Sequence, residues 1–217
     1  MSTLQIKKSL LLSVFTHDML AAILRGKVSN INEKISKMVK KGELIRLKRG
    51  VYAWGELYRD GPVDKIAAAN RLLSPSYVSF EYALSYHGLI PERVYEVTSA
   101  TTKPKKEFDT PLGRFSYRSV PVLAFSLGLQ WLYDEREGGR LIGTAEKALC
   151  DTLRSKKGLS GMSQKRLLEY LTDDLRIEEA ELFKLDAELI RAIAVAYRST
   201  VLRELGAMIA KERRRSA

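Results

Sequence analysis

The chain has 217 residues, of which 45% are hydrophobic and 29% charged, and its formal net charge is +11. These proportions are typical of a globular protein and exclude a disordered chain, which would have far fewer apolar residues. The single cysteine, Cys150, excludes an internal disulfide bond and favours a reducing cytoplasm, where we expect the protein to act. The apolar run 10–15 is too short for a signal peptide. The longest uncharged stretch, 119–133, is shorter than the ~20 residues that cross a bilayer, so we expect no membrane contact.

The positive charge is concentrated near the N-terminus. Residues 1–54 contain eleven Lys and Arg against Asp18, Glu33 and Glu43, a net charge of +8, whereas the remaining 163 residues carry only +3. Charge concentrated in one short segment is typical of a module that binds a polyanion such as nucleic acid. A basic surface that is merely solvated is the alternative, and the pattern of apolar residues has to distinguish the two.

Two short helices are predicted in this basic segment. Thr16 is a good N-cap for a helix over 16–24, and after a turn at 25–28 Ser29 is the expected N-cap of a second helix that ends before Gly42. The apolar residues of each helix recur at spacings that place them on one face. They are Met19, Leu20, Ile23 and Leu24 in the first helix, and Ile31, Ile35, Met38 and Val39 in the second.

A β-hairpin is predicted to follow the second helix. Residues 43–47 and 51–54 have the pattern of strands, and Lys48-Arg49-Gly50 between them supplies a short basic turn with a glycine. Two helices joined by a tight turn and followed by a hairpin predict a winged helix-turn-helix, a DNA-binding arrangement, over residues 1–55.

Residues 56–217 are predicted to form one mixed α/β domain of helices and antiparallel strands, helical from about residue 144. Ser79 and Thr144 are expected helix N-caps. The expected helices cover 63–73, 79–87, 144–156, 163–171 and parts of 178–214, and the expected strands cover 94–99, 107–110, 114–120 and 130–133. The fold class is therefore predicted as α+β, with a winged helix-turn-helix followed by a mixed α/β domain that ends in a helical segment.

The helix over 29–41 is the expected recognition helix. Its N-terminal side chains include asparagines, which pair bidentately with adenine, and Glu33, which can accept a hydrogen bond from cytosine. Lysines farther along the helix and basic residues of the hairpin are expected to hold phosphates or enter a narrow minor groove. The residues predicted to contact DNA are Ser29, Asn30, Asn32, Lys34, Lys37, Lys40 and Lys41 of the helix, and Arg46, Lys48 and Arg49 of the hairpin.

The sequence gives little basis for catalysis. It contains only two histidines, His17 and His87, and one cysteine, so residues that could ligate a metal are scarce. No acidic residue stands two positions before a lysine, no Gly-Ser dipeptide occurs, and the phosphate-binding P-loop pattern is missing. We therefore expect no enzyme, no catalytic residues, no metal site and no cofactor. Two further basic clusters, 103–106 and 211–215, are interpreted as solvated segments, with an auxiliary nucleic-acid contact as the alternative.

Four blocks of the sequence, in order, resemble a known family. They are Leu47-Lys-Arg-Gly-Val-Tyr52, the segment 77–91 (YVSFEYALSYHGLIP), the segment 143–151 (GTAEKALCD) and Asp174-Leu-Arg-Ile177. Together they span nearly the whole chain, and in this order they are similar to the AbiEi-type antitoxins of bacterial abortive-infection (type IV) toxin–antitoxin systems. Ala145 departs from the family pattern, which has proline there, but proline at that position is a helix-start preference and carries no chemistry.

The resemblance implies a transcriptional repressor that regulates its own operon as part of an antiviral defence system. It implies an N-terminal DNA-binding domain, a C-terminal domain linked to neutralising the toxin, and an operon that also encodes a nucleotidyltransferase-like toxin. The implied partners are double-stranded operator DNA, expected to carry inverted repeats, and the toxin, with direct contact between the two proteins left open. The alternative function is an interaction protein that binds RNA or the toxin itself through its basic surface.

Overall fold

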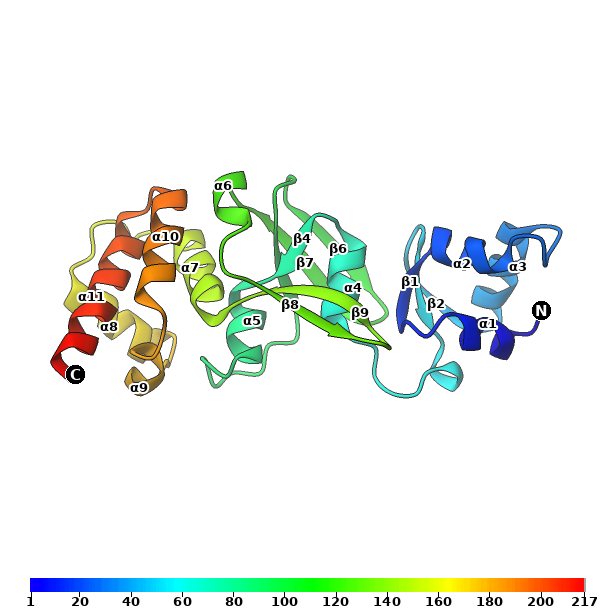
Figure 1. The fold of residues 1–217 in the computed structure, drawn as a ribbon, viewed down its shortest axis with the longest axis horizontal. Helices are drawn as coiled ribbons and strands as arrows, with labels where there is room; N and C mark the ends of the chain where they lie inside the picture. The colour runs from blue at the N-terminus through cyan, green and yellow to red at the C-terminus, as the bar shows by residue number, and fades with distance from the viewer. Residues whose placement is uncertain (217) are drawn as a thin grey trace.

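The computed structural model describes residues 1–216 and is a mixed α+β protein. Its elements follow one another along an elongated molecule (Figure 1). The N-terminal helices and a three-stranded sheet lie at one end, a six-stranded sheet lies in the middle, and the C-terminal helices form the other end. The predicted α+β class is confirmed, and so is the helical end of the chain. No helix within residues 1–216 has the length and apolar character required to cross a membrane.

The N-terminal part contains the two helices and the hairpin that the sequence predicts. They are α2 (His17–Leu24), α3 (Ile31–Lys40), β2 (Leu44–Lys48) and β3 (Val51–Trp54). A further helix, α1 (Thr3–Ser9), and a short strand, β1 (Val14–Thr16), precede them. The strands are antiparallel in the order β1-β3-β2, so the first strand lies against the outer side of the hairpin.

The expected N-cap of α3 is wrong by one residue. The Oδ1 atom of Asn30, not the side chain of Ser29, accepts a hydrogen bond from the backbone N–H of Glu33 at 3.0 Å. Both residue types make good caps, and Asn30 has the extended backbone that a cap requires. The predicted cap of α2 is confirmed, since Thr16 accepts from the N–H of Met19.

The three-stranded sheet contributes residues to a core on each of its two faces. One face packs with helices α1 to α3 around a small core, and the other face belongs to the large core of the rest of the molecule. All four residues of β3 are buried. The sheet residues in the small core are Phe15, Leu44, Tyr52 and Trp54, and those in the large core are Val14, Leu47, Val51 and Ala53. The hairpin is therefore a layer shared by two cores.

The central sheet has six strands in the order β6-β7-β5-β4-β9-β8. It is mixed, whereas the sequence predicts antiparallel strands, because β4 pairs in parallel with β9 and β5 in parallel with β7. Neither β4 nor β9 is predicted from the sequence. The strands are β4 (Ser76–Val78), β5 (Val97–Thr101), β6 (Lys106–Thr110), β7 (Gly113–Ser119), β8 (Leu129–Asp134) and β9 (Gly138–Gly143).

Helices pack against this sheet and then form the C-terminal end. The helix α7 connects the two regions, and seven consecutive residues of it, 147–153, are buried, including Cys150. Thr144 caps α7 as predicted, whereas the Ser79 hydroxyl donates to Asp151 instead of capping its own helix. The helices are α4 (Lys65–Leu72), α5 (Phe80–Tyr86), α6 (Val122–Phe125), α7 (Ala145–Ser155), α8 (Gln164–Glu169), α9 (Glu179–Leu182), α10 (Ala187–Tyr197) and α11 (Thr200–Ser216).

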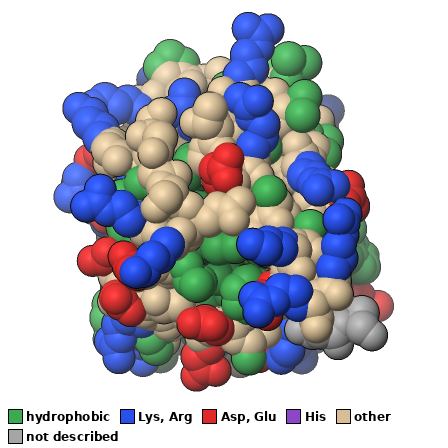
Figure 2. Space-filling view, turned by 90° about the vertical axis from the view of Figure 1, so that its left-hand side faces the viewer, with side chains coloured by type: hydrophobic (Ala, Val, Ile, Leu, Met, Phe, Trp, Pro, Cys, Tyr) green, Lys and Arg blue, Asp and Glu red, His purple; other side chains and the backbone are tan. Residues whose placement is uncertain are grey.

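The C-terminal end of the molecule has mixed surface charge. Figure 2 shows this end, where Lys and Arg side chains lie in several separate places with acidic side chains between them. In the basic C-terminal segment, the Arg213 guanidinium donates to the backbone carbonyls of Phe183 and Lys184, at 3.3 and 2.6 Å. This arginine therefore holds α11 against the turn after α9.

Candidate nucleic-acid interface

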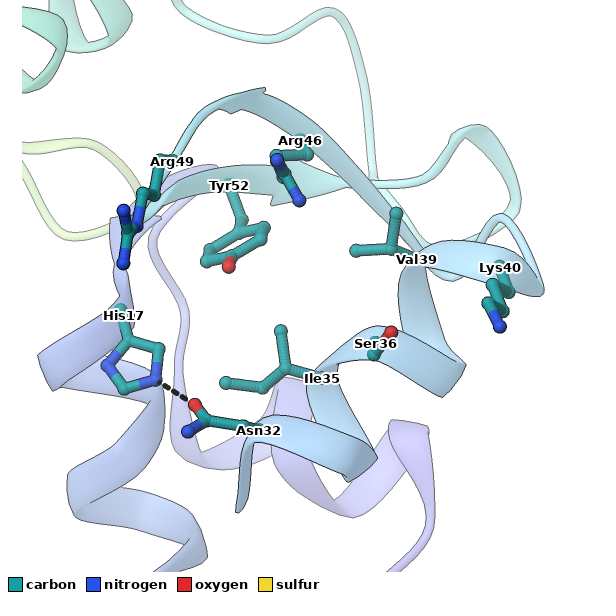
Figure 3. Close-up of a pocket in the computed structure, with 10 residues that line it drawn as sticks. His17, Asn32, Ile35, Ser36, Val39, Lys40, Arg46, Arg49 and Tyr52 are labelled. Atoms are coloured by element: carbon teal, nitrogen blue, oxygen red, sulfur yellow. Dashed lines mark hydrogen bonds between the residues drawn. The ribbon is translucent and has the colours of Figure 1, made fainter. Parts of the chain in front are cut away.

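A groove of about 880 Å³ runs between α3 and the β2–β3 hairpin (Figure 3). Helix α3 forms one side of the groove. Its apolar face packs into the small core through Ile35 and Met38, so the polar residues beside that face lie toward the opening. The hairpin and the start of α2 form the rest. The residues that line the groove are His17, Asn32, Ile35, Ser36, Val39, Lys40, Arg46, Arg49, Gly50 and Tyr52.

The charge of the groove is uniformly positive. Lys40 comes from the last turn of α3, Arg46 from β2, and Arg49 from the turn of the hairpin, and all three are exposed. The lining includes no Asp or Glu. Three cations on two sides of an open groove attract an anionic ligand and lose little hydration before it arrives.

His17 and Asn32 meet at one edge of the groove (Figure 3). The Nε2 atom of His17 is 2.9 Å from Oδ1 of Asn32, which links the start of α2 to the first turn of α3 (Figure 3). On its other side, Nδ1 of His17 is 3.4 Å from the exposed carboxylate of Asp18. The imidazole thus fixes the orientation of the Asn32 amide, whose Oδ1 it contacts and whose Nδ2 has no hydrogen-bond partner among residues 1–216.

The structure brings four of the predicted residues together in the groove: Asn32, Lys40, Arg46 and Arg49. Lys37 lies outside it and pairs with Glu33 at 2.6 Å on the exposed face of α3, and this bond lowers the pKa of the Glu33 carboxyl. The remaining helix positions flank the groove. Ser29 and Lys41 are exposed, Lys34 is half-buried, and Asn30 uses its side-chain oxygen as the helix cap.

Lys48 points away from the groove. Its Nζ donates to the backbone carbonyl of Leu72 at 2.6 Å and lies 5.5 Å from the centre of the Phe108 ring. Burial, with Lys106 and Lys103 nearby, lowers the pKa of the Lys48 ammonium. A register shift between Arg46 and Lys48 separates the directions of the two side chains. Lys48 therefore joins the hairpin to the second part of the chain.

Six of the ten groove residues, among them His17, Ser36 and Tyr52, are not among the contacts predicted from the sequence. His17 follows the helix cap Thr16 and Tyr52 lies in a buried strand, and neither carries a local pattern that marks a binding site. The only signal is that both fall within the basic segment 1–54. Tyr52 is 8% exposed, so it forms the floor of the groove.

Elsewhere, the residues that the structure describes contain no group of three or more His, Cys, Asp or Glu side chains suited to a metal ion. The aromatic residues near 77–95 divide between two environments. Tyr77 and Phe80 are buried, whereas Tyr86 and Tyr95 are exposed.

A comparison with protein-family models finds no match for this sequence, and a comparison with curated protein sequences finds none either.

Proposed function

We propose that this protein is a DNA-binding transcriptional repressor whose N-terminal part acts as a winged helix-turn-helix. In this proposal α3 is the recognition helix, α2 is the helix that precedes it, and the β2–β3 hairpin is the wing. The observation that carries the proposal is the groove between α3 and the hairpin, which has Lys40, Arg46 and Arg49 on its walls and no acidic residue. A duplex offers phosphates to such cations and base edges to the side chains of α3.

Asn32 is the best-placed residue for reading bases. It lies in the first turn of α3, where recognition helices contact base edges, and His17 holds its amide in one orientation. Ser36 lies one helical turn farther along and lines the same groove. Arg46 and Arg49 then hold the phosphates or enter the minor groove beside the wing.

The resemblance to the AbiEi-type antitoxins extends the proposal to an operon and a toxin. On this reading, the protein covers inverted repeats upstream of its own gene and limits a nucleotidyltransferase-like toxin encoded beside it. The residues outside the N-terminal part supply the antitoxic effect. This part of the proposal rests on the four sequence blocks, among them the segment 143–151, which forms the end of β9 and the buried half of α7.

A reporter driven by the promoter upstream of the gene tests the proposal. The wild-type chain should repress the reporter, and the double variant Arg46→Ala/Arg49→Ala should lose most of this repression. The matched control is Arg166→Ala, which removes an exposed arginine of α8 far from the groove. Equal repression by the wild type and the double variant would contradict the role of the groove.

A second arm tests the antitoxin function and the alternative partner. The chain is expressed beside the neighbouring reading frame, and growth is measured with and without it. Rescue of growth by the wild type supports the antitoxin role, and lack of rescue rejects it. Tight binding of RNA by the purified chain, with no preference for the promoter duplex, would favour the interaction-protein alternative.

A further inference from the structure

A second hollow, separate from the groove, lies where α5, β7, α7 and α10 meet. Its volume is about 460 Å³, within the range of pockets that hold small organic ligands. The floor includes Tyr197 and Asp151, and the walls include Phe80, Val120, Arg118 and Arg154. The hollow thus combines apolar walls with two guanidinium groups.

The floor of this hollow is built from a buried polar cluster. One oxygen of the Asp151 carboxylate accepts from the Tyr197 hydroxyl at 2.6 Å and from Lys147 at 2.9 Å. The other oxygen accepts from Tyr77 at 2.8 Å and from Ser79 at 2.7 Å. With four donors, Asp151 is fully satisfied and its charge is neutralised by Lys147, so the floor is rigid and does not repel an anion.

One residue of the wall, Phe80, has an unusual backbone conformation. Phe80, a residue with a bulky side chain, has a φ of 57°, in the left-handed region that such residues rarely adopt. Its ring is buried and lies 4.5 Å from the Arg118 guanidinium carbon, which fixes that side chain against the wall. Backbone strain of this kind is concentrated at binding sites, where the surrounding packing maintains it.

Of the two guanidinium groups in the hollow, that of Arg154 has no acidic partner among residues 1–216. Arg118 pairs with Glu81 at 3.1 Å, whereas Arg154 has no hydrogen-bond or ion-pair partner among residues 1–216. Arg154 also lines a smaller adjoining hollow of about 200 Å³, together with Lys156 and Arg198. The N-terminal end of the 17-residue helix α11 opens into this second hollow and adds a partial positive charge.

We propose that these two adjoining hollows form a binding site for a small phosphomonoester, the size of a nucleoside monophosphate. The phosphate lies between Arg154 and Arg198 at the start of α11, where guanidinium groups donate paired hydrogen bonds to its oxygens. The organic part occupies the larger hollow against Tyr197 and Val120. The site is independent of the groove, so it stands whether or not the chain binds DNA.

Isothermal titration of the full chain with AMP tests this site, with adenosine and inorganic phosphate as partial ligands. AMP should bind, adenosine should bind at least about tenfold more weakly because it lacks the charge-assisted bonds, and inorganic phosphate should also be weaker because it leaves the larger hollow empty. A 5′-phosphorylated dinucleotide distinguishes a free ester from a nucleic-acid end. If it binds at least as tightly as AMP, the ligand is a nucleic-acid terminus and the proposal of a free ester fails.

Two variants locate the binding. Arg154→Ala should weaken AMP binding about tenfold to a hundredfold, while Arg166→Ala should leave it unchanged. Ser119→Trp fills the larger hollow without removing a charge, and it should reduce AMP binding but retain the weaker phosphate binding. Both variants should unfold at the wild-type temperature, since Arg154 and Ser119 are exposed. Absence of AMP binding by the wild type, or AMP affinity unchanged in both variants, would overturn the proposal.

Discussion

The imidazole of His17 and the amide of Asn32 are in contact at one edge of the groove, with Nε2 and Oδ1 separated by 2.9 Å. His17 belongs to the first turn of α2 and Asn32 to the first turn of α3. Neither residue is fixed in this geometry by its own helix. The contact therefore links the starts of the two helices and sets the direction of the Asn32 amide.

This contact makes His17 a positioning residue for base reading. Asn32→Ala should remove preference for one base pair of the operator, worth about 1–3 kcal/mol at that position. His17→Ala should weaken the same preference by a smaller amount, because the amide then rotates freely. His17→Gln, which can still donate to Asn32, should restore part of it. Binding to a set of single-base operator variants measures all three, and a changed preference at a different base pair in His17→Ala would contradict the assignment.

The salt dependence of DNA binding should reflect the cations that the structure leaves exposed. Lys48 is bonded to the carbonyl of Leu72 and Lys37 is paired with Glu33, whereas Lys40, Lys41, Arg46 and Arg49 are exposed and have no ion-pair partner among residues 1–216. With about four phosphate contacts, the logarithm of the binding constant should fall against the logarithm of salt concentration with a slope of about −4. Arg49→Ala should make this slope shallower by about one, and Lys48→Ala should leave it unchanged. Fluorescence polarisation at several salt concentrations measures the slopes, and a flat dependence rejects an electrostatic interface.

Because the three-stranded sheet is shared between the two cores, we predict that residues 1–55 do not fold alone. A fragment cut at residue 55 would expose the sheet face formed by Val14, Leu47, Val51 and Ala53, all at most 5% exposed in the whole chain. The free energy of unfolding of a domain of about 60 residues is small. Exposure of one apolar face of the sheet to water would remove a large part of that free energy. Circular dichroism of the fragment during heating should show no cooperative transition. A sharp transition comparable with that of the full chain would show that the small core suffices.

The buried ion pair predicts a large loss of stability on removal of one partner. Asp151→Ala leaves the Lys147 ammonium, which is fully buried, without its counter-ion, and should lower the free energy of unfolding by about 3–5 kcal/mol. The double variant Lys147→Met/Asp151→Leu should recover part of this loss because no charge stays buried.

Glu188→Ala is the matched control for this comparison, since it breaks the exposed pair with Arg191 and should cost less than about 1 kcal/mol. Urea denaturation of the full chain measures each variant. A loss for Asp151→Ala as small as that for Glu188→Ala would show that the cluster around Asp151 does not support the fold.

The sequence predicts those parts of the fold whose signal is local. The change from helical to alternating spacing at Gly42 identifies α3 and the hairpin, and Thr144 identifies the start of α7. The strands β4 and β9 depend instead on distant pairing. One has three residues, and the other contains three glycines, so neither has the apolar alternation of a strand.

The candidate site likewise combines features that the local sequence predicts with contacts that depend on tertiary packing. The basic residues of α3 and the hairpin are visible in the sequence because they are clustered within one segment. The partner of Asn32 is fifteen residues away and becomes a neighbour only through the packing of two helices. The direction of Lys48 depends on a register shift in the hairpin and on the carbonyl of Leu72, which belongs to the second part of the chain.

The affinity of the purified full chain for the duplex upstream of its own gene, compared with a shuffled duplex of the same length and composition, tests the central claim most directly. At physiological salt the promoter duplex should bind at least about a thousandfold more tightly, the difference typical of specific protein–DNA complexes. Arg46→Ala/Arg49→Ala should weaken binding to both duplexes, and Asn32→Ala should mainly reduce the ratio between them. Equal affinity of the wild-type chain for the two duplexes would contradict a repressor that reads its operator through this groove.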